Sequence, residues 1–284
     1  MKTRRSVAAI AGLIEQVQQV LREEHPQTLR QLFYQMVVRK LLGNTMSEYR
    51  ALSHQLVKAR KAGLIQWEAI EDRTRMPHIP AMWDSPREIL ENSLYCYRRN
   101  VWLNQARLIE VWIEKEALSA VFERATKQYG VTVNVGRGYD GWSSIYEAAQ
   151  RFRKAEQESH PVTVLYFGDF DPTGEDISRS LAERFLEFGC EPGVVRCALS
   201  YEDIQLYNLP AAMTKTSDSR AAKHIAKYGE VSSVELDALP SQVLRERIRT
   251  EIEKRMDMDA LILCRQQEHA EIAELFHVLQ KYDA

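Results

Sequence analysis

The stretch VTVLYFGDFDPTGEDI, residues 162–177, decides which fold we expect of this chain. It opens with an apolar run that is typical of a buried strand. Four acids follow at once, with a Pro and a Gly among them: Asp169, Asp171, Glu175 and Asp176. In open parallel sheets, ligands bind at the carboxyl ends of the strands. The stretch therefore predicts a strand of a parallel sheet that ends in a functional loop.

Around this stretch, segments typical of strands alternate with segments typical of helices. Residues 106–118 have a strand pattern followed by a helix pattern; further strand patterns lie within residues 131–139, 162–169 and 191–199, and further helix patterns within 142–155 and 174–189. Such alternation predicts an α/β domain with a mainly parallel sheet. From about residue 218 the pattern is mostly helical, including residues 241–256.

The front of the chain has a different pattern of apolar residues. Apolar residues at spacings of three and four predict helices within residues 7–21, 29–42 and 49–63. Thr28 is the expected N-cap of the second helix, and Gly63 is expected to end the third. With the segment that follows, residues 64–75, three short helices resemble a winged-helix or helix-turn-helix unit.

A proline-rich region, residues 76–100, then separates the helical front from the part in which strand and helix patterns alternate. We therefore expect two domains: a helical, winged-helix-like domain at residues 1–100, and an α/β domain at residues 101–284 that ends in a helical segment.

The charge is distributed unevenly. The whole chain of 284 residues has a formal net charge of −2. Residues 1–107 hold 17 Lys and Arg against 10 Asp and Glu, which leaves 21 against 30 for the rest. The basic front of the chain favours binding of a polyanion such as nucleic acid, and the acidic remainder favours binding of cations. The alternative is that solvated helix faces happen to differ in sign.

Other features exclude several classes of protein. The four cysteines show neither C-x-x-C spacing nor a nearby set of histidines, so the sequence does not indicate a zinc site. The first apolar stretch is short and is interrupted by Glu15, which predicts an amphipathic helix instead of a signal peptide. No stretch approaches the length of an apolar membrane span. We expect reduced thiols and a cytoplasmic protein.

Three carboxylates are candidates for a metal site. Glu114 ends one predicted strand, and Asp169 and Asp171 follow another. If the two strands are neighbours, all three acids meet at one edge of the sheet. Asp169 and Asp171 are two residues apart, so in extended backbone they point to the same side and could share a hard cation. Each acid taken singly is more often a helix cap or a salt-bridge partner, and Glu175 and Asp176 are expected to complement a helix dipole.

These motifs resemble those of the Toprim domain, which occurs in topoisomerases, primases and several nucleases. The segment GDFDPTGEDI, residues 168–177, is similar to the D-x-D-P-x-G form of the topoisomerase VI A subunit and the related meiotic double-strand-break protein. The resemblance implies that Glu114, Asp169 and Asp171 hold magnesium, for which manganese can substitute. Many Toprim domains have Gly after the Glu, whereas this chain has Lys115 and Glu116.

A second motif lies in the front domain. The segment LRQLFYQMV, residues 29–37, is similar to the R-[DE]-x-[YF]-Y pattern that carries the nucleophilic Tyr of the topoisomerase VI A subunit. The resemblance places Tyr34 at the nucleophile position and Arg30 beside it. Gln31 stands where the pattern has an acid. Without the resemblance, a Phe-Tyr pair on a helix is more often part of a core.

Several basic residues are candidates for contacts with backbone phosphates, which would give salt-sensitive and largely sequence-independent affinity. They are Lys58, Arg60, Lys61, Arg73, Arg75, Lys115 and Arg137. A solvated helix face is the alternative for Lys58, Arg60 and Lys61, a plain turn for Arg137, and a counter-charge to the acids for Lys115. Glu235 and Asp237 are expected to border the metal site without a catalytic role.

Three functions remain open from the sequence. The first is magnesium-dependent cleavage of double-stranded DNA by Tyr34, which implies a homodimer in which Tyr34 of one subunit meets the metal of the other. The chain has no G-x-x-x-x-G-K-[ST] loop, so strand passage would require a separate ATPase subunit. The second is a hydrolytic Toprim nuclease of a defence or plasmid system in which Tyr34 is structural. The third is a DNA-binding module without catalysis.

Overall fold

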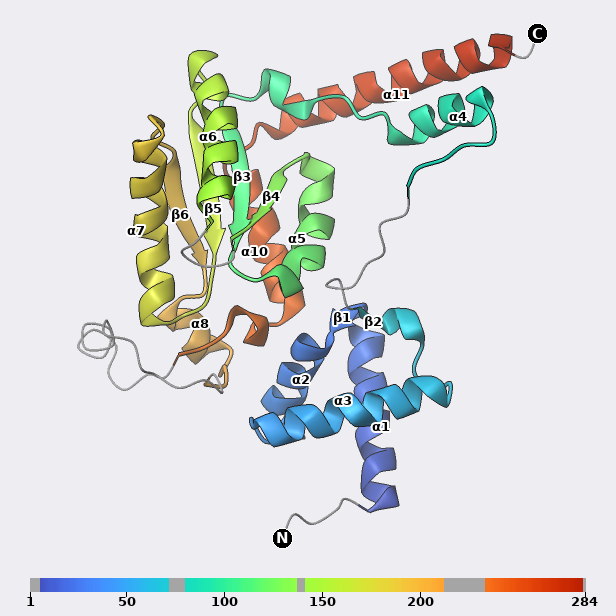
Figure 1. Ribbon diagram of the computed structural model, residues 1–284, viewed down its shortest axis with the longest axis vertical. Helices are drawn as coiled ribbons and strands as arrows, with labels where there is room; N and C mark the ends of the chain where they lie inside the picture. Colours follow the sequence, from blue (N-terminus) through green and yellow to red (C-terminus); the bar gives the residue numbers. More distant parts are fainter. Residues whose placement is uncertain (1–5, 72–79, 137–140, 212–232, 283–284) are drawn as a thin grey trace.

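The computed structural model describes residues 6–71, 80–136, 141–211 and 233–282. In this structure the front of the chain is a small helical unit and the remainder is built on a sheet, with a pair of helices extending to one side (Figure 1).

Three helices dominate the front unit, and their caps explain where they begin. Its elements are α1 (Val7–Glu23), β1 (Gln27–Thr28), α2 (Leu29–Val38), α3 (Met46–Lys61), η1 (Trp67–Ala69) and β2 (Ile70–Glu71). Thr28 caps α2, as predicted from the sequence, and Gly63 follows α3 in the left-handed region at φ 72°. Strands β1 and β2 pair in parallel, with Gln27 opposite Ile70.

A four-stranded parallel sheet forms the centre of the second part. Its strands are β3 (Leu108–Ile113), β4 (Thr132–Val135), β5 (Val162–Phe167) and β6 (Gly193–Ala198). They are arranged in the order β4-β3-β5-β6, and every pairing is parallel. The mixed α/β class and the parallel sheet that the sequence predicts are therefore confirmed.

Helices cover both faces of this sheet. Helices α6 (Trp142–Gln157) and α7 (Pro172–Glu187) lie on one face, and α5 (Ser119–Thr126) and α10 (Ser241–Glu253) lie on the other (Figure 1). Side chains alternate along a strand, so Tyr166 of β5 packs with the α6 and α7 layer while Phe167 packs with Phe122 of α5. All six residues of β5 are buried, as expected for a central parallel strand.

The remaining helices extend this core. They are α4 (Pro86–Cys96), η3 (Val101–Asn104), η4 (Glu116–Leu118), η5 (Lys127–Tyr129), α8 (Tyr201–Leu206), η7 (Leu236–Ala238) and α11 (Met258–Tyr282). Helix α4 lies along α11, away from the front unit (Figure 1). The segment that follows α4 is linked to α11, because Glu268 of α11 accepts a hydrogen bond from the backbone N–H of Arg99 at 2.7 Å. Among the described helices, none has both the length and the apolar character needed to cross a membrane.

Candidate active site

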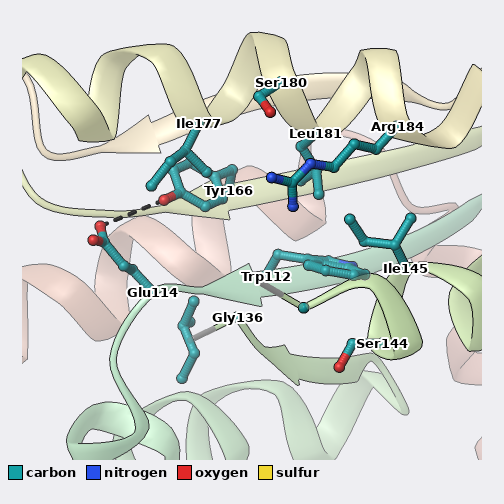
Figure 2. A pocket seen from close by; sticks show the side chains of 12 residues that line it. Trp112, Glu114, Gly136, Ser144, Ile145, Tyr166, Ile177, Ser180, Leu181 and Arg184 are labelled. Atoms are coloured by element: carbon teal, nitrogen blue, oxygen red, sulfur yellow. Dashed lines mark hydrogen bonds between the residues drawn. The ribbon is translucent and has the colours of Figure 1, made fainter. Parts of the chain in front are cut away.

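Glu114 and Asp169 lie side by side because β3 and β5 are neighbours. Ile113 is paired with Phe167 at the carboxyl ends of these strands. The backbone N–H of Asp169 donates a hydrogen bond to Oε2 of Glu114 at 2.9 Å. The hydroxyl of Tyr166 donates to the same oxygen at 3.4 Å (Figure 2). The two strands are therefore neighbours, which the sequence analysis required for a shared site.

Gly168 makes this close approach possible. A Cβ at this position would lie 2.5 Å from the Tyr166 hydroxyl oxygen and 2.8 Å from Oε2 of Glu114. Such contacts are too short for any side chain. Behind the Glu114–Tyr166 pair is a small, largely apolar pocket of about 30 Å³ between α6 and α7, with Arg184 toward its other end (Figure 2).

Lys115, the residue after Glu114, is at the centre of an acidic cluster. Its Nζ lies 2.8 Å from Oε2 of Glu235, 3.1 Å from Oδ2 of Asp169 and 3.3 Å from Oδ2 of Asp237. Burial alone would lower the pKa of Lys115, but the three carboxylates outweigh it and raise that pKa above its usual range. In this structure Lys115 offsets the acids, which is one of the two roles expected of it.

Glu235 and Asp237 come from a distant part of the sequence. Phe170 and Val234 form an antiparallel bridge in which each backbone N–H donates to the other's carbonyl at 2.9 Å. The N–H of Leu236 then donates to Oδ1 of Asp169 at 2.8 Å. These bonds place η7 against the loop after β5, and both acids therefore border the site, as the sequence analysis expected.

The cluster holds more carboxylates than cations, because the four acids Glu114, Asp169, Glu235 and Asp237 lie around Lys115 and Arg30. Burial raises the pKa of Asp169 to about 7; Lys115 opposes this shift, and the neighbouring charge of Glu114 adds to it. Burial also raises the pKa of Asp237. Oδ1 of Asp237 is buried and has no hydrogen-bond partner among the described residues. A site with these properties favours an additional cation.

The donor chemistry of the predicted ligands fits a hard divalent ion. Glu114, Asp169 and the half-buried Asp171 offer carboxylate oxygens, which magnesium prefers. In the parts of the chain that the structure describes, no three His, Cys, Asp or Glu side chains are already arranged as a metal-binding group. The ammonium of Lys115 lies among the acids instead. The residues therefore fit the ion in type and charge.

Tyr34 and Arg30 of α2 lie against the same cluster. Arg30 donates from Nη1 to Oε2 of Glu235 at 2.5 Å. Tyr34 is only 1% exposed, and its hydroxyl has no hydrogen-bond partner among the described residues. Burial and the charge of Glu235 raise the pKa of Tyr34 far above its usual range, and Arg30 and Lys115 counteract this only in part. In this conformation the hydroxyl is neither exposed nor ionised at neutral pH.

Gln31, which stands where the motif has an acid, makes two hydrogen bonds. Its Oε1 accepts from the N–H of Thr28 at 2.9 Å and completes a capping box at the start of α2. Its Nε2 donates to Oγ of Ser241 at 3.0 Å. Gln31 therefore joins the front unit to α10 in the same chain.

A larger pocket opens beside the cluster. It measures about 560 Å³ and lies between α2, α3 and the segment after β3. Arg30, Arg60, Lys115 and Asp237 are among the residues that line it. The guanidinium of Arg60 stacks 4.3 Å from the ring centre of Trp67 and donates to the carbonyl of Ile70 at 3.1 Å. The structure thus brings two of the predicted DNA contacts, Arg60 and Lys115, to one pocket with Arg30.

The other predicted DNA contacts are placed differently. Lys58 and Lys61 are exposed in the last turn of α3. Arg73, Arg75 and Arg137 lie outside the described residues.

Two residues of the site were missed by the sequence analysis: Tyr166, and Arg196, which donates to the backbone oxygen of Asp169 at 2.6 Å. Their positions near the carboxyl ends of β5 and β6 were the only signal.

Comparisons of the chain with protein-family models, with curated proteins and with solved structures found no match. The function must therefore be argued from the geometry of this site.

Proposed function

We propose that the chain binds duplex DNA and hydrolyses a phosphodiester bond with the help of a divalent cation. The observation that carries this proposal is the cluster at the carboxyl edge of β3 and β5, in which the carboxylates of Glu114, Asp169, Glu235 and Asp237 surround the cations of Lys115 and Arg30. A cluster that holds more carboxylates than cations favours an additional bound cation. The burial of Tyr34 favours water over that hydroxyl as the nucleophile.

The finer fold assignment belongs to the same proposal. We assign α1 to α3 to a winged-helix-like domain and the four-stranded sheet to a Toprim domain. The strand order and the acids after β3 and β5 support the second assignment. A cytoplasmic location suits a protein that acts on DNA and carries free cysteines.

The chemistry can be divided among the residues of the site. Glu114, Asp169 and Asp171 would hold magnesium or manganese, and the ion supplies charge stabilisation to the reacting phosphate when bound. Arg30 and Lys115 line the larger pocket and would donate hydrogen bonds to phosphate oxygens. Lys58 and Lys61 would contact the backbone further along the duplex. Water adds to phosphorus and the bond to the leaving oxygen breaks, which produces one hydroxyl end and one phosphate end.

The test is cleavage of supercoiled and linear DNA with magnesium, with manganese and with a chelator. We expect Asp169→Asn to lose at least about 100-fold in rate because it removes a ligand charge at the reacting centre. The matched control is Asp259→Asn, which changes an exposed carboxylate in the first turn of α11. Equal cleavage by Asp169→Asn and the unmodified protein would refute the proposal, as would full activity with the chelator.

Cleavage by Tyr34 is the second candidate, and one observation favours it. The Tyr34 hydroxyl is buried beside Arg30 and Lys115 without a hydrogen-bond partner among the described residues. A hydroxyl left unpaired costs stability, so a functional reason for keeping it is worth testing. A homodimer and a separate ATPase subunit belong to this candidate alone.

The same cleavage reactions, run on denaturing gels, separate the two candidates. Hydrolysis predicts equal product for the unmodified protein and Tyr34→Phe, with no protein attached to DNA. Transesterification predicts a covalent protein–DNA adduct that disappears in Tyr34→Phe.

A further inference from the structure

A third pocket, separate from the acidic cluster, is lined by arginines. It has a volume of about 440 Å³ and lies where the end of α1 meets α5 and α10. Arg22 comes from α1, Arg124 from α5, and Arg245 and Arg249 from successive turns of α10. Gln128 also lines it. Residues from three separate elements therefore bring four guanidinium groups to one concavity.

The ion pairs of three of these arginines are absent among the described residues or solvent-exposed. Arg22 makes no ion pair with any carboxylate in the described parts of the chain. Arg249 pairs at 3.1 Å with Glu246 of its own helix, where both side chains are about half exposed or more. Arg124 reaches Glu71 at 3.4 Å with its side chain 42% exposed. Exposed pairs of this kind contribute little, so a ligand can displace them at low cost.

The two acids in the pocket do not neutralise it. Glu24 is held at 2.6 Å by Arg245. Glu23 forms its ion pair with Arg39, which is not part of the pocket lining. Four arginines against two glutamates leave a formal surplus of two positive charges at a concave surface.

We propose that this pocket binds a phosphate group. Guanidinium is the side chain best suited to phosphate, because its planar donors match the oxygens in pairs. The phosphate can come from the DNA backbone, in which case the inference rests on the proposed function, or from a free nucleotide. The pocket is separate from the candidate active site and shares none of its lining residues with the larger pocket beside Lys115.

The first measurement is binding of a fluorescent 20-bp duplex, followed by anisotropy from 50 to 300 mM salt. The test variant is Arg22→Gln/Arg249→Gln, which leaves the Arg245–Glu24 pair intact. The control is Arg87→Gln/Arg179→Gln, which removes two positive charges from exposed helix positions outside this pocket. Each phosphate contact adds about 0.9 to the salt slope, or roughly eightfold in affinity at 0.1 M salt. We expect the test variant alone to lose up to about 1.8 from that slope.

The second measurement is calorimetric titration of ATP and of inorganic phosphate into the same three proteins. If the pocket takes its phosphate from a nucleotide, ATP binding is lost in the test variant and kept in the control, while DNA binding stays unchanged. If the phosphate belongs to DNA, only the first measurement changes. If the test variant matches the control in both measurements, the inference is wrong.

A third variant separates this inference from the proposed function. Lys58→Gln/Lys61→Gln removes the exposed lysines of α3 that the proposed function uses. If these lysines matter and the arginine pocket does not, DNA binding by the protein stands while the pocket inference fails. If the unmodified protein binds no DNA at all, the proposed function fails, and the ATP titration alone decides on the pocket.

Discussion

At the scale of one residue, the candidate site depends on the absence of a side chain at Gly168. Gly168 sits between Tyr166 and Asp169, and both Glu114 and the Tyr166 hydroxyl occupy the volume that a Cβ would take. A side chain here would push Glu114 away from the N–H of Asp169, because the contacting atoms are held from both strands. A glycine at position 168 is therefore needed for Glu114 to reach the N–H of Asp169.

We predict that Gly168→Ala lowers the free energy of unfolding by about 1–3 kcal/mol through overpacking. It should also weaken manganese binding, measured by paramagnetic resonance, because it displaces Glu114. The matched control is Gly12→Ala inside α1, where nothing lies within 4 Å of the added Cβ. That change should raise stability by about 0.5–1 kcal/mol. Unchanged stability and metal binding in Gly168→Ala would contradict our account of the site.

At the scale of elements, a buried ion pair ties β3 to α6. Glu110 of β3 is fully buried and accepts from Nε of Arg151 at 2.7 Å and from Nδ2 of Asn134 at 2.6 Å. A carboxylate inside a sheet is costly unless it is paired and hydrogen-bonded. Since Glu114 directly follows β3, this pair helps to fix the strand that presents the site.

We predict that Arg151→Leu lowers the free energy of unfolding by about 1–3 kcal/mol, because it leaves the fully buried Glu110 without its half-exposed cation. The double variant Glu110→Leu/Arg151→Leu should recover most of that loss, since it removes both charges together. Denaturant unfolding of the two variants and of Glu110→Leu completes the cycle. A double variant as unstable as Arg151→Leu would mean that packing, not charge, makes this contact important.

At the scale of the whole molecule, the front unit is joined to the sheet domain through α2. Arg30 pairs with Glu235, and Gln31 bonds to Ser241 of α10. Glu235 also accepts from Lys115. The acidic cluster is therefore both the candidate site and the junction between the two parts of the chain, so the position of the front unit depends on the charge state of the cluster.

We predict that Arg30→Met loosens α2 against η7 without unfolding the sheet. The pair is partly exposed, so the loss is about 1 kcal/mol or less, or up to fivefold in hydrogen-exchange protection of α2. Helix α10 and strand β5 should keep their protection. Arg39→Met, which breaks a pair with Glu23 inside the front unit, is the control. Equal loss of protection in α2 and β5 would show that the two parts unfold together.

Much of the fold could be predicted because it follows local patterns. Apolar spacing located the main helices and the four strands, and Thr28 and Gly63 marked helix ends through cap and turn chemistry that involves only neighbouring residues. The parallel alternation also placed Glu114 and Asp169 at one edge, because the carboxyl ends of parallel strands meet there.

The contacts between residues far apart in the sequence could not be predicted. The bridge between Phe170 and Val234 carries Glu235 and Asp237 to Lys115, and the packing of α2 against η7 buries Tyr34. Local patterns cannot specify such contacts, because they depend on how the packed elements close the intervening loops. Local sequence patterns were enough to identify Glu114 and Asp169 as acids at the sheet edge. The charges around them, such as Glu235 and Arg30, come from long-range packing that those patterns do not specify.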